Sequence, residues 1–183
     1  MDENEESRAG AYSLKQILTT EKGILHLGPT RAVVMTESAF VFLLRVLHEN
    51  APHILKYALY DMGYRAGNQM ASARPSQSET PEESFHLLVE TYKQAGYGNL
   101  EVLEYDLSVP RARLRGTHLL ESSAACEADI YRSPRAVDHY TRGMLAGLMS
   151  NTLGHQVVCE EIACEFRGDP ACEFVILPFG GEE

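Results

Sequence analysis

The chain has 183 residues, of which 44% are hydrophobic and 23% charged, which is ordinary for a globular protein with one substantial core. Its formal net charge of −10 argues against a nucleic-acid-binding surface, because such a surface needs clustered Lys and Arg. No apolar run approaches the roughly 20 residues needed to span a bilayer, so we expect no membrane insertion.

The N-terminus is acidic and polar and does not resemble a secretory signal. Residues 1–10 are predicted to be disordered because they combine low hydrophobicity with high charge. Residues 11–183 are predicted to form a single domain. Four cysteines in a chain of this length do not suggest a secreted disulfide scaffold, so we expect a cytoplasmic protein with reduced thiols.

The first elements predicted are a short helix over residues 12–20 and a hairpin. The hairpin strands cover residues 24–27 and 31–36, and the turn is Gly28-Pro29-Thr30.

Two helices follow the hairpin. Thr36 is a candidate N-cap for a helix over 37–49, whose apolar residues go nearly all the way round and therefore predict burial on most sides. A second helix is expected over 53–70. Its Gly63 and Gly67 lie four residues apart, which lets another backbone approach closely.

The helix with the clearest start signal begins after Thr80. Thr80 is an N-cap, Pro81 occupies the first helical position and Glu83 completes a capping box. Gly96 predicts the end of this helix.

The remaining elements are mainly strands. Residues 100–107 and 111–120 predict two strands, residues 133–153 a helix, and residues 157–167 and 172–177 a closing hairpin. The order of helices, strands, helix and hairpin indicates an α+β fold, with an antiparallel twisted sheet packed against several helices.

The closing hairpin brings two cysteines together. If its turn centres on Gly168, Cys164 lies opposite Cys172, at the spacing of directly opposed residues. Two buried thiols, a disulfide and a pair of metal ligands are all compatible with this placement. The acidic neighbours Glu160, Glu161 and Glu165 favour a metal such as zinc over a disulfide.

The same segment resembles a known family. Glu161-x2-Cys164-x3-Gly168-Asp169-Pro170-x-Cys172-x-Phe174 is similar to the C-terminal signature of 4-vinyl reductase domains. That family includes sensor domains of regulators that respond to aromatic compounds, and proteins associated with bacteriochlorophyll synthesis. Its fold is similar to that of TRAPP vesicle-tethering subunits.

The resemblance also implies a ligand set for zinc. In aromatic-sensing members a Glu and two Cys match Glu161, Cys164 and Cys172, while a third, upstream Cys falls on Asp138 here. Asp138 or the adjacent His139 would then be the fourth ligand.

Strict strand alternation conflicts with this set in one respect. It places Glu160, not Glu161, on the face of Cys164. A β-bulge between the glutamate and the cysteine would remove the conflict. We keep Glu161 as the ligand, with Glu160 as the alternative.

The function that follows is small-molecule binding. The resemblance implies a sensor or regulatory domain for an apolar or aromatic ligand, with a structural zinc and signalling through a separate protein partner. Tyrosines suit such a site because each offers a ring and a hydroxyl. The candidate ligand-binding residues are Tyr57, Tyr60, Tyr92 and Tyr140.

Two further functions remain open. One is a scaffold or interaction protein without a ligand, and the other is an accessory factor or enzyme in tetrapyrrole vinyl reduction. No nicotinamide, flavin or phosphate-loop motif is present, so we name no catalytic residue and do not expect an enzyme. The apolar surface of helices 37–49 and 53–70 predicts a homodimer.

Overall fold

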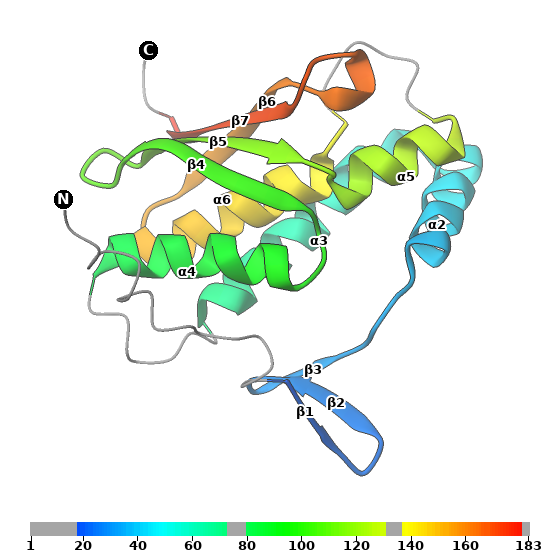
Figure 1. Cartoon of the computed structure of the whole chain (residues 1–183), viewed down its shortest axis with the longest axis horizontal. Helices are drawn as coiled ribbons and strands as arrows, with labels where there is room; N and C mark the ends of the chain where they lie inside the picture. Colours follow the sequence, from blue (N-terminus) through cyan, green and yellow to red (C-terminus); the bar gives the residue numbers. More distant parts are fainter. Residues whose placement is uncertain (1–17, 73–79, 131–136, 181–183) are drawn as a thin grey trace, which may run out of the picture. The chain divides into compact units, whose positions relative to one another are not determined.

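The computed structural model describes residues 18–72, 80–130 and 137–180 (Figure 1). The predicted disorder of residues 1–10 therefore lies outside the described residues. The chain divides into two compact units at Val33–Val34.

The N-terminal unit is a three-stranded antiparallel meander of β1 (Leu18–Glu21), β2 (Ile24–Leu27) and β3 (Thr30–Ala32). The predicted hairpin is confirmed, since Leu27 pairs with Thr30 across the turn. The helix predicted over 12–20 is wrong at its described end, because Leu18 pairs with Leu27 as part of a strand. Cross-strand pairing there overrides the local helical pattern.

Two helices open the second unit. Helix α2 (Glu37–Asn50) has the predicted cap, in which the Thr36 hydroxyl accepts a hydrogen bond from the Ala39 N–H. Helix α3 covers Pro52–Ser72. The prediction that α2 is buried on most sides is wrong, because its buried side chains are confined to one face and Phe42 is 66% exposed. An apolar composition does not distinguish a helix inside a core from one with an uncovered face.

Helix α3 packs closely on helix α6 (His139–Leu153) through glycines. A Cβ atom at Gly63 or Gly67 would overlap backbone carbonyl oxygens of α6, and one at Gly143 or Gly147 would overlap carbonyl oxygens of α3. The close approach predicted from the glycine spacing in α3 is therefore confirmed. Each helix contributes two glycines to the contact.

Helix α4 (Pro81–Gln94) begins as predicted. Thr80 and Glu83 exchange the two hydrogen bonds of a capping box, and Pro81 occupies the first turn. The helix packs on α6 and on strand β4 (Asn99–Asp106), which follows it in the chain.

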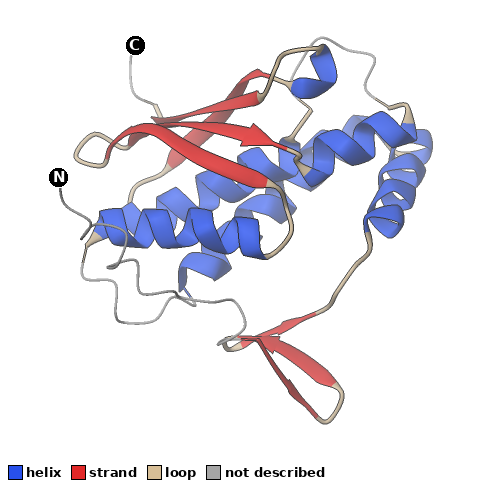
Figure 2. Ribbon diagram, viewed as in Figure 1, coloured by secondary structure: helices blue, strands red, loops and turns tan. Residues whose placement is uncertain are grey.

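The second sheet is antiparallel, with strand order β4-β5-β7-β6. Strands β5 (Arg111–Thr117) and β7 (Cys172–Pro178) are central, and β4 and β6 (Val157–Ala163) form the edges. Helices α4 and α6 lie against one face of this sheet, and α3 lies behind α6 (Figure 2). The α+β architecture predicted from the element order is confirmed.

Two boundaries differ from the predictions. Residues 118–120 do not extend β5, because a new helix, α5 (Leu120–Ala128), begins there and contacts α2 and α6. The helix predicted from residue 133 begins at His139, with Asp138 as its N-cap residue.

None of the helices in the described part of the chain is both long enough and apolar enough to cross a membrane.

Candidate metal centre

The β6–β7 hairpin contains the bulge that the sequence required. Ala163 pairs with Glu173, whereas Glu161 pairs with Phe174, so the register shifts by one residue at Ile162. The shift turns Glu161 inward while Ile162 and Glu160 remain exposed. The last predicted strand residues are different, because Glu165–Arg167 form a 3-10 turn before Gly168.

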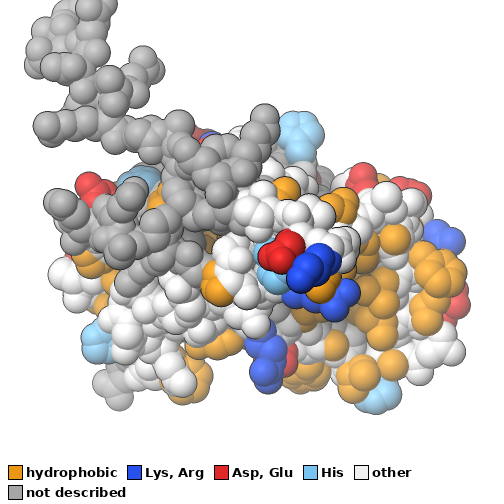
Figure 3. Space-filling model, turned by 90° about the horizontal axis from the view of Figure 1, so that it is seen from below, with side chains coloured by type: hydrophobic (Ala, Val, Ile, Leu, Met, Phe, Trp, Pro, Cys, Tyr) orange, Lys and Arg blue, Asp and Glu red, His pale blue; other side chains and the backbone are white. Residues whose placement is uncertain are grey.

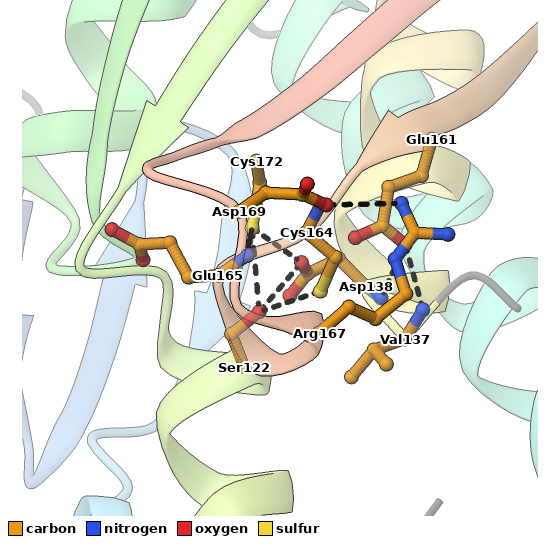
Figure 4. A network of polar contacts seen from close by, with 9 residues as sticks. All are labelled: Ser122, Val137, Asp138, Glu161, Cys164, Glu165, Arg167, Asp169 and Cys172. Atoms are coloured by element: carbon orange, nitrogen blue, oxygen red, sulfur yellow. Dashed lines mark hydrogen bonds and ion pairs between the residues drawn. The ribbon is translucent and has the colours of Figure 1, made fainter. Parts of the chain in front are cut away.

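Four side chains converge beside this turn: Asp138, Glu161, Cys164 and Cys172. Their potential ligand atoms all lie within 4.8 Å of one another, and Figure 4 shows the side chains pointing toward a common centre. They come from the start of α6, from β6 and its end, and from the start of β7. The group can hold a metal ion.

The two cysteines are held by the backbone of the turn. The Cys164 N–H donates to Asp169 Oδ2 at 2.8 Å, and Asp169 also forms an ion pair with Arg167. The Glu165 N–H points at Cys172 Sγ at 3.3 Å. Both cysteine side chains are buried and neither is in a disulfide.

Asp138 reaches the sulfurs through one carboxylate oxygen. Its Oδ2 accepts hydrogen bonds from the Cys172 thiol at 3.2 Å and from the Ser122 hydroxyl at 2.7 Å. Ser122 Oγ also lies 3.5 Å from Cys172 Sγ and 3.8 Å from Cys164 Sγ. Ser122 therefore contacts three of the four cluster residues.

Glu161 ties the cluster to the start of α6. Its Oε2 accepts the backbone N–H groups of Val137 at 2.6 Å and of Asp138 at 3.1 Å. These bonds fix the segment that delivers the Asp138 side chain.

The donor set fits a metal ion. Asp138 Oδ1 and Glu161 Oε1 are buried and have no hydrogen-bond partner among the described residues. A buried carboxylate oxygen without a partner is costly, and coordination of a cation would remove that cost. Two thiols and two carboxylates are ligand types that zinc accepts in a four-coordinate site.

The electrostatics show how unfavourable the cluster is as an assembly of negative charges. Burial, together with the neighbouring Glu161, raises the pKa of Asp138 to about 7 from an ordinary 3.8. Contact with Cys164 and burial raise the pKa of Cys172 far above that of a free thiol. A bound cation would reverse both effects by stabilising the deprotonated forms.

The remaining predicted metal residue lies outside the cluster. His139 is buried next to Asp138, but its ring is 3.3 Å from an Arg142 guanidinium nitrogen. Burial and Arg142 lower the pKa of His139 to about 4. Cys126 is exposed and Cys159 is buried, and neither is among the four converging residues.

The predicted ligand-binding tyrosines do not share one location. Tyr92 and Tyr140 lie on either side of Tyr97, with ring centroids 5.3 and 5.4 Å from it. Tyr60 stands apart from this stack, with the Arg142 guanidinium 5.8 Å from its ring centroid. Tyr57 is 78% exposed, so its ring does not line an interior site.

The hydroxyl groups of the stack already have partners. The Tyr92 hydroxyl lies 3.0 Å from Thr141 Oγ1, and the Tyr140 hydroxyl donates to that of Tyr97 at 3.0 Å. A surface cavity of about 620 Å³ lies elsewhere, among the ends of α4, α6 and β7, and none of the four predicted tyrosines lines it.

Sequence reasoning missed the contribution of α5. Ser122 and Glu121 are both buried on its first turn, and both contact the start of α6 or the cluster. The sequence around them, LESSAACEA, has no side-chain cap and a weak apolar stripe, so only the three-dimensional arrangement reveals them.

The comparisons with known proteins agree with this geometry. Residues 120–178, from α5 to the end of β7, match the vinyl-4-reductase domain family. All four cluster residues and Ser122 lie within this segment. The predicted resemblance to 4-vinyl reductase domains is therefore confirmed over that part of the chain.

Similar proteins extend the likeness beyond that segment. The phenol-responsive sensory domain of the transcription activator PoxR, solved with phenol, is similar over 93% of this chain and 89% of its own, with a TM-score of 0.84 and 16% identity. A trafficking protein particle complex subunit 3 from Naegleria fowleri, covalently bound to palmitic acid, is similar over 78% of this chain and 94% of its own, with a TM-score of 0.55 and 14% identity. An uncharacterised protein of Methanocaldococcus jannaschii is 27% identical over 86% of this chain and 71% of its own length.

Proposed function

We propose that this chain is a sensor or regulatory domain that binds a small apolar or aromatic molecule and contains a structural zinc site. The observation that carries the zinc proposal is the convergence of two thiols and two carboxylates within 4.8 Å, with two buried carboxylate oxygens left without partners among the described residues. Zinc accepts both ligand types, and four protein ligands make a closed, structural site.

In this proposal Asp138, Glu161, Cys164 and Cys172 hold the ion. When bound, zinc supplies a cross-link between the β6–β7 hairpin and the first turn of α6. Ser122 and the backbone of the 165–167 turn orient the sulfur and carboxylate groups around it. His139 takes no part as a ligand, because its ring is directed at Arg142.

The ligand-binding part of the proposal is supported by the fold of the PoxR sensory domain, whose structure was solved with phenol. The stack of Tyr92, Tyr97 and Tyr140 offers both ring faces and hydroxyls between α4 and α6. We propose that the ligand contacts this stack, together with Tyr60. The output then goes to a separate protein partner, through a shift between two arrangements of the domain or of a dimer.

We further propose that α2 contributes to a homodimer interface. Phe42, Leu43 and Val46 are exposed on this helix. Figure 3 shows hydrophobic side chains gathered on the side of the molecule where α2 lies. A self-complementary patch of this kind is typical of two-fold dimers.

One observation favours a scaffold without a ligand as the second candidate. The hydroxyls of Tyr92 and Tyr140 are satisfied by other side chains of the protein, as in a permanent core.

Native mass spectrometry of protein purified without added metal tests these proposals together. We expect one zinc per chain, a retained small molecule or one that binds when phenol is added, and a dimer. Zinc without any ligand would favour the scaffold. A metal-free protein that also takes up no zinc on titration would contradict the zinc site.

Replacing Phe42 by Glu is expected to convert the dimer to a monomer, because a buried charge without a partner opposes association. Analytical ultracentrifugation would measure the change. Phe179→Glu is the matched control, since Phe179 is also 66% exposed but lies at the end of β7. Dimers that persist in Phe42→Glu would contradict the proposed interface.

A further inference from the structure

The start of helix α6 is capped by side chains from other elements. The first backbone N–H groups of a helix have no partner within the helix and usually receive one from the N-cap side chain. Here the N-cap residue is Asp138, but its carboxylate makes no capping hydrogen bond. The N–H groups of Tyr140 and Thr141 instead donate to Glu121 Oε2, at 2.7 and 3.4 Å.

Asp138 is therefore available for another role. Its Oδ2 is turned toward Cys172 and Ser122, and its Oδ1 is buried without a partner among the described residues. Asp is one of the commonest N-cap residues, so this carboxylate has a competing, locally favourable position on its own helix. Some other group has to occupy that position for Asp138 to face the sulfurs.

We propose that Glu121 is a positioning residue for the metal centre, which caps α6 in place of Asp138 and so frees the Asp138 carboxylate to bind the ion. The inference rests on the proposed zinc site. Glu121 does not touch the metal in this proposal and acts through Asp138.

The surroundings of Glu121 support this assignment. The side chain is 2% exposed, and a buried carboxyl is retained at such a position only where its hydrogen bonds matter. Glu121 immediately precedes Ser122, whose hydroxyl holds Asp138 Oδ2. The first turn of α5 thus supplies both the substitute cap and the group that fixes the freed carboxylate.

The inference predicts that Glu121→Ala weakens zinc binding by about 10- to 100-fold, the range typical of residues that orient metal ligands. Without Glu121, the Asp138 carboxylate turns back to cap its own helix. Glu121→Gln should bind zinc nearly as the wild type does, because its amide oxygen still accepts the two N–H groups. Competition with a chromophoric chelator would measure the affinities, and Glu127→Ala, at an exposed position of α5, is the control.

A double-mutant cycle with Asp138→Ala separates positioning from a general loss of structure. If Glu121 acts through Asp138, then Glu121→Ala lowers affinity in the wild-type background and not in the Asp138→Ala background. An equal loss in both backgrounds would overturn the inference, as would wild-type affinity in Glu121→Ala. If Glu121→Ala does not fold, Glu121→Asp withdraws the carboxylate by one methylene and takes its place in the cycle.

The cycle also distinguishes this inference from the zinc proposal. Failure of the wild type to bind zinc would overturn both. Zinc binding by the wild type that is lost in Cys172→Ser but unchanged in Glu121→Ala would overturn the positioning role alone. Co²⁺ substitution adds a spectroscopic check, because Glu121→Ala should keep both thiolate-to-metal bands while the ligand-field bands shift.

Discussion

Replacing Gly147 by Ala is expected to destabilise the protein by about 2–3 kcal/mol, the cost of forcing an extra group into a tightly packed contact. In an ordinary helix the same change is stabilising by about 1 kcal/mol. The sign reverses here because the new Cβ would overlap the carbonyl oxygen of Tyr64, which belongs to the α3 backbone and has little freedom to move.

Urea denaturation followed by far-ultraviolet circular dichroism would measure this loss. Adding Gly143→Ala to the variant should leave little folded protein, since a second overlap with Tyr60 arises on the same helix face. Ala66→Gly is the control in α3 and should cost about 1 kcal/mol. A Gly147→Ala protein as stable as the wild type would contradict the close approach of the two helices.

Replacing Cys172 by Ser is expected to abolish stabilisation by zinc. At a free zinc concentration a thousandfold above the dissociation constant, the wild type should gain about 4 kcal/mol, because the ion binds the folded state alone. Serine stays protonated at neutral pH and is a poor ligand, so the variant should gain almost nothing. Cys126→Ser is the control, since Cys126 is exposed and lies outside the cluster.

Thermal unfolding with and without zinc would measure this difference, and its pH dependence has a defined sign. Without metal, the raised pKa of Asp138 means that the folded state holds a proton between pH 3.8 and about 7 that the unfolded state has lost. Stability from this group is complete below pH 3.8 and declines as the pH rises through about 7. Zinc binding displaces protons, so the stabilisation by zinc should grow over the same range. A gap that narrows with rising pH would contradict the carboxylate as a ligand.

Local sequence signals were enough to predict part of the fold. The capping box at Thr80, the hairpin around Gly168 and the glycine pair in α3 each depend on residues close together in the chain. The bulge at Ile162 was predictable because strand alternation and the expected ligand spacing disagreed by one residue.

The features that the sequence did not reveal depend on contacts between distant elements. Helix α5 has no side-chain cap, and its two important residues face α6 and the hairpin, which are 16 or more positions away. The uncovered face of α2 was unpredictable for a related reason. Its apolar residues go round the helix, and only the positions of its neighbours decide which of them are buried.

The outer edge of strand β6 has a consequence for how copies of this protein can associate. The Cys159 carbonyl points away from β7 and accepts a hydrogen bond from Arg142 Nε at 3.0 Å. A side chain from α6 thus occupies an acceptor that an incoming strand would need, and the bulge at Ile162 further interrupts the row. Extension of the sheet by strand addition is discouraged along this border, which makes β-type aggregation there unfavourable and directs assembly toward helical surfaces.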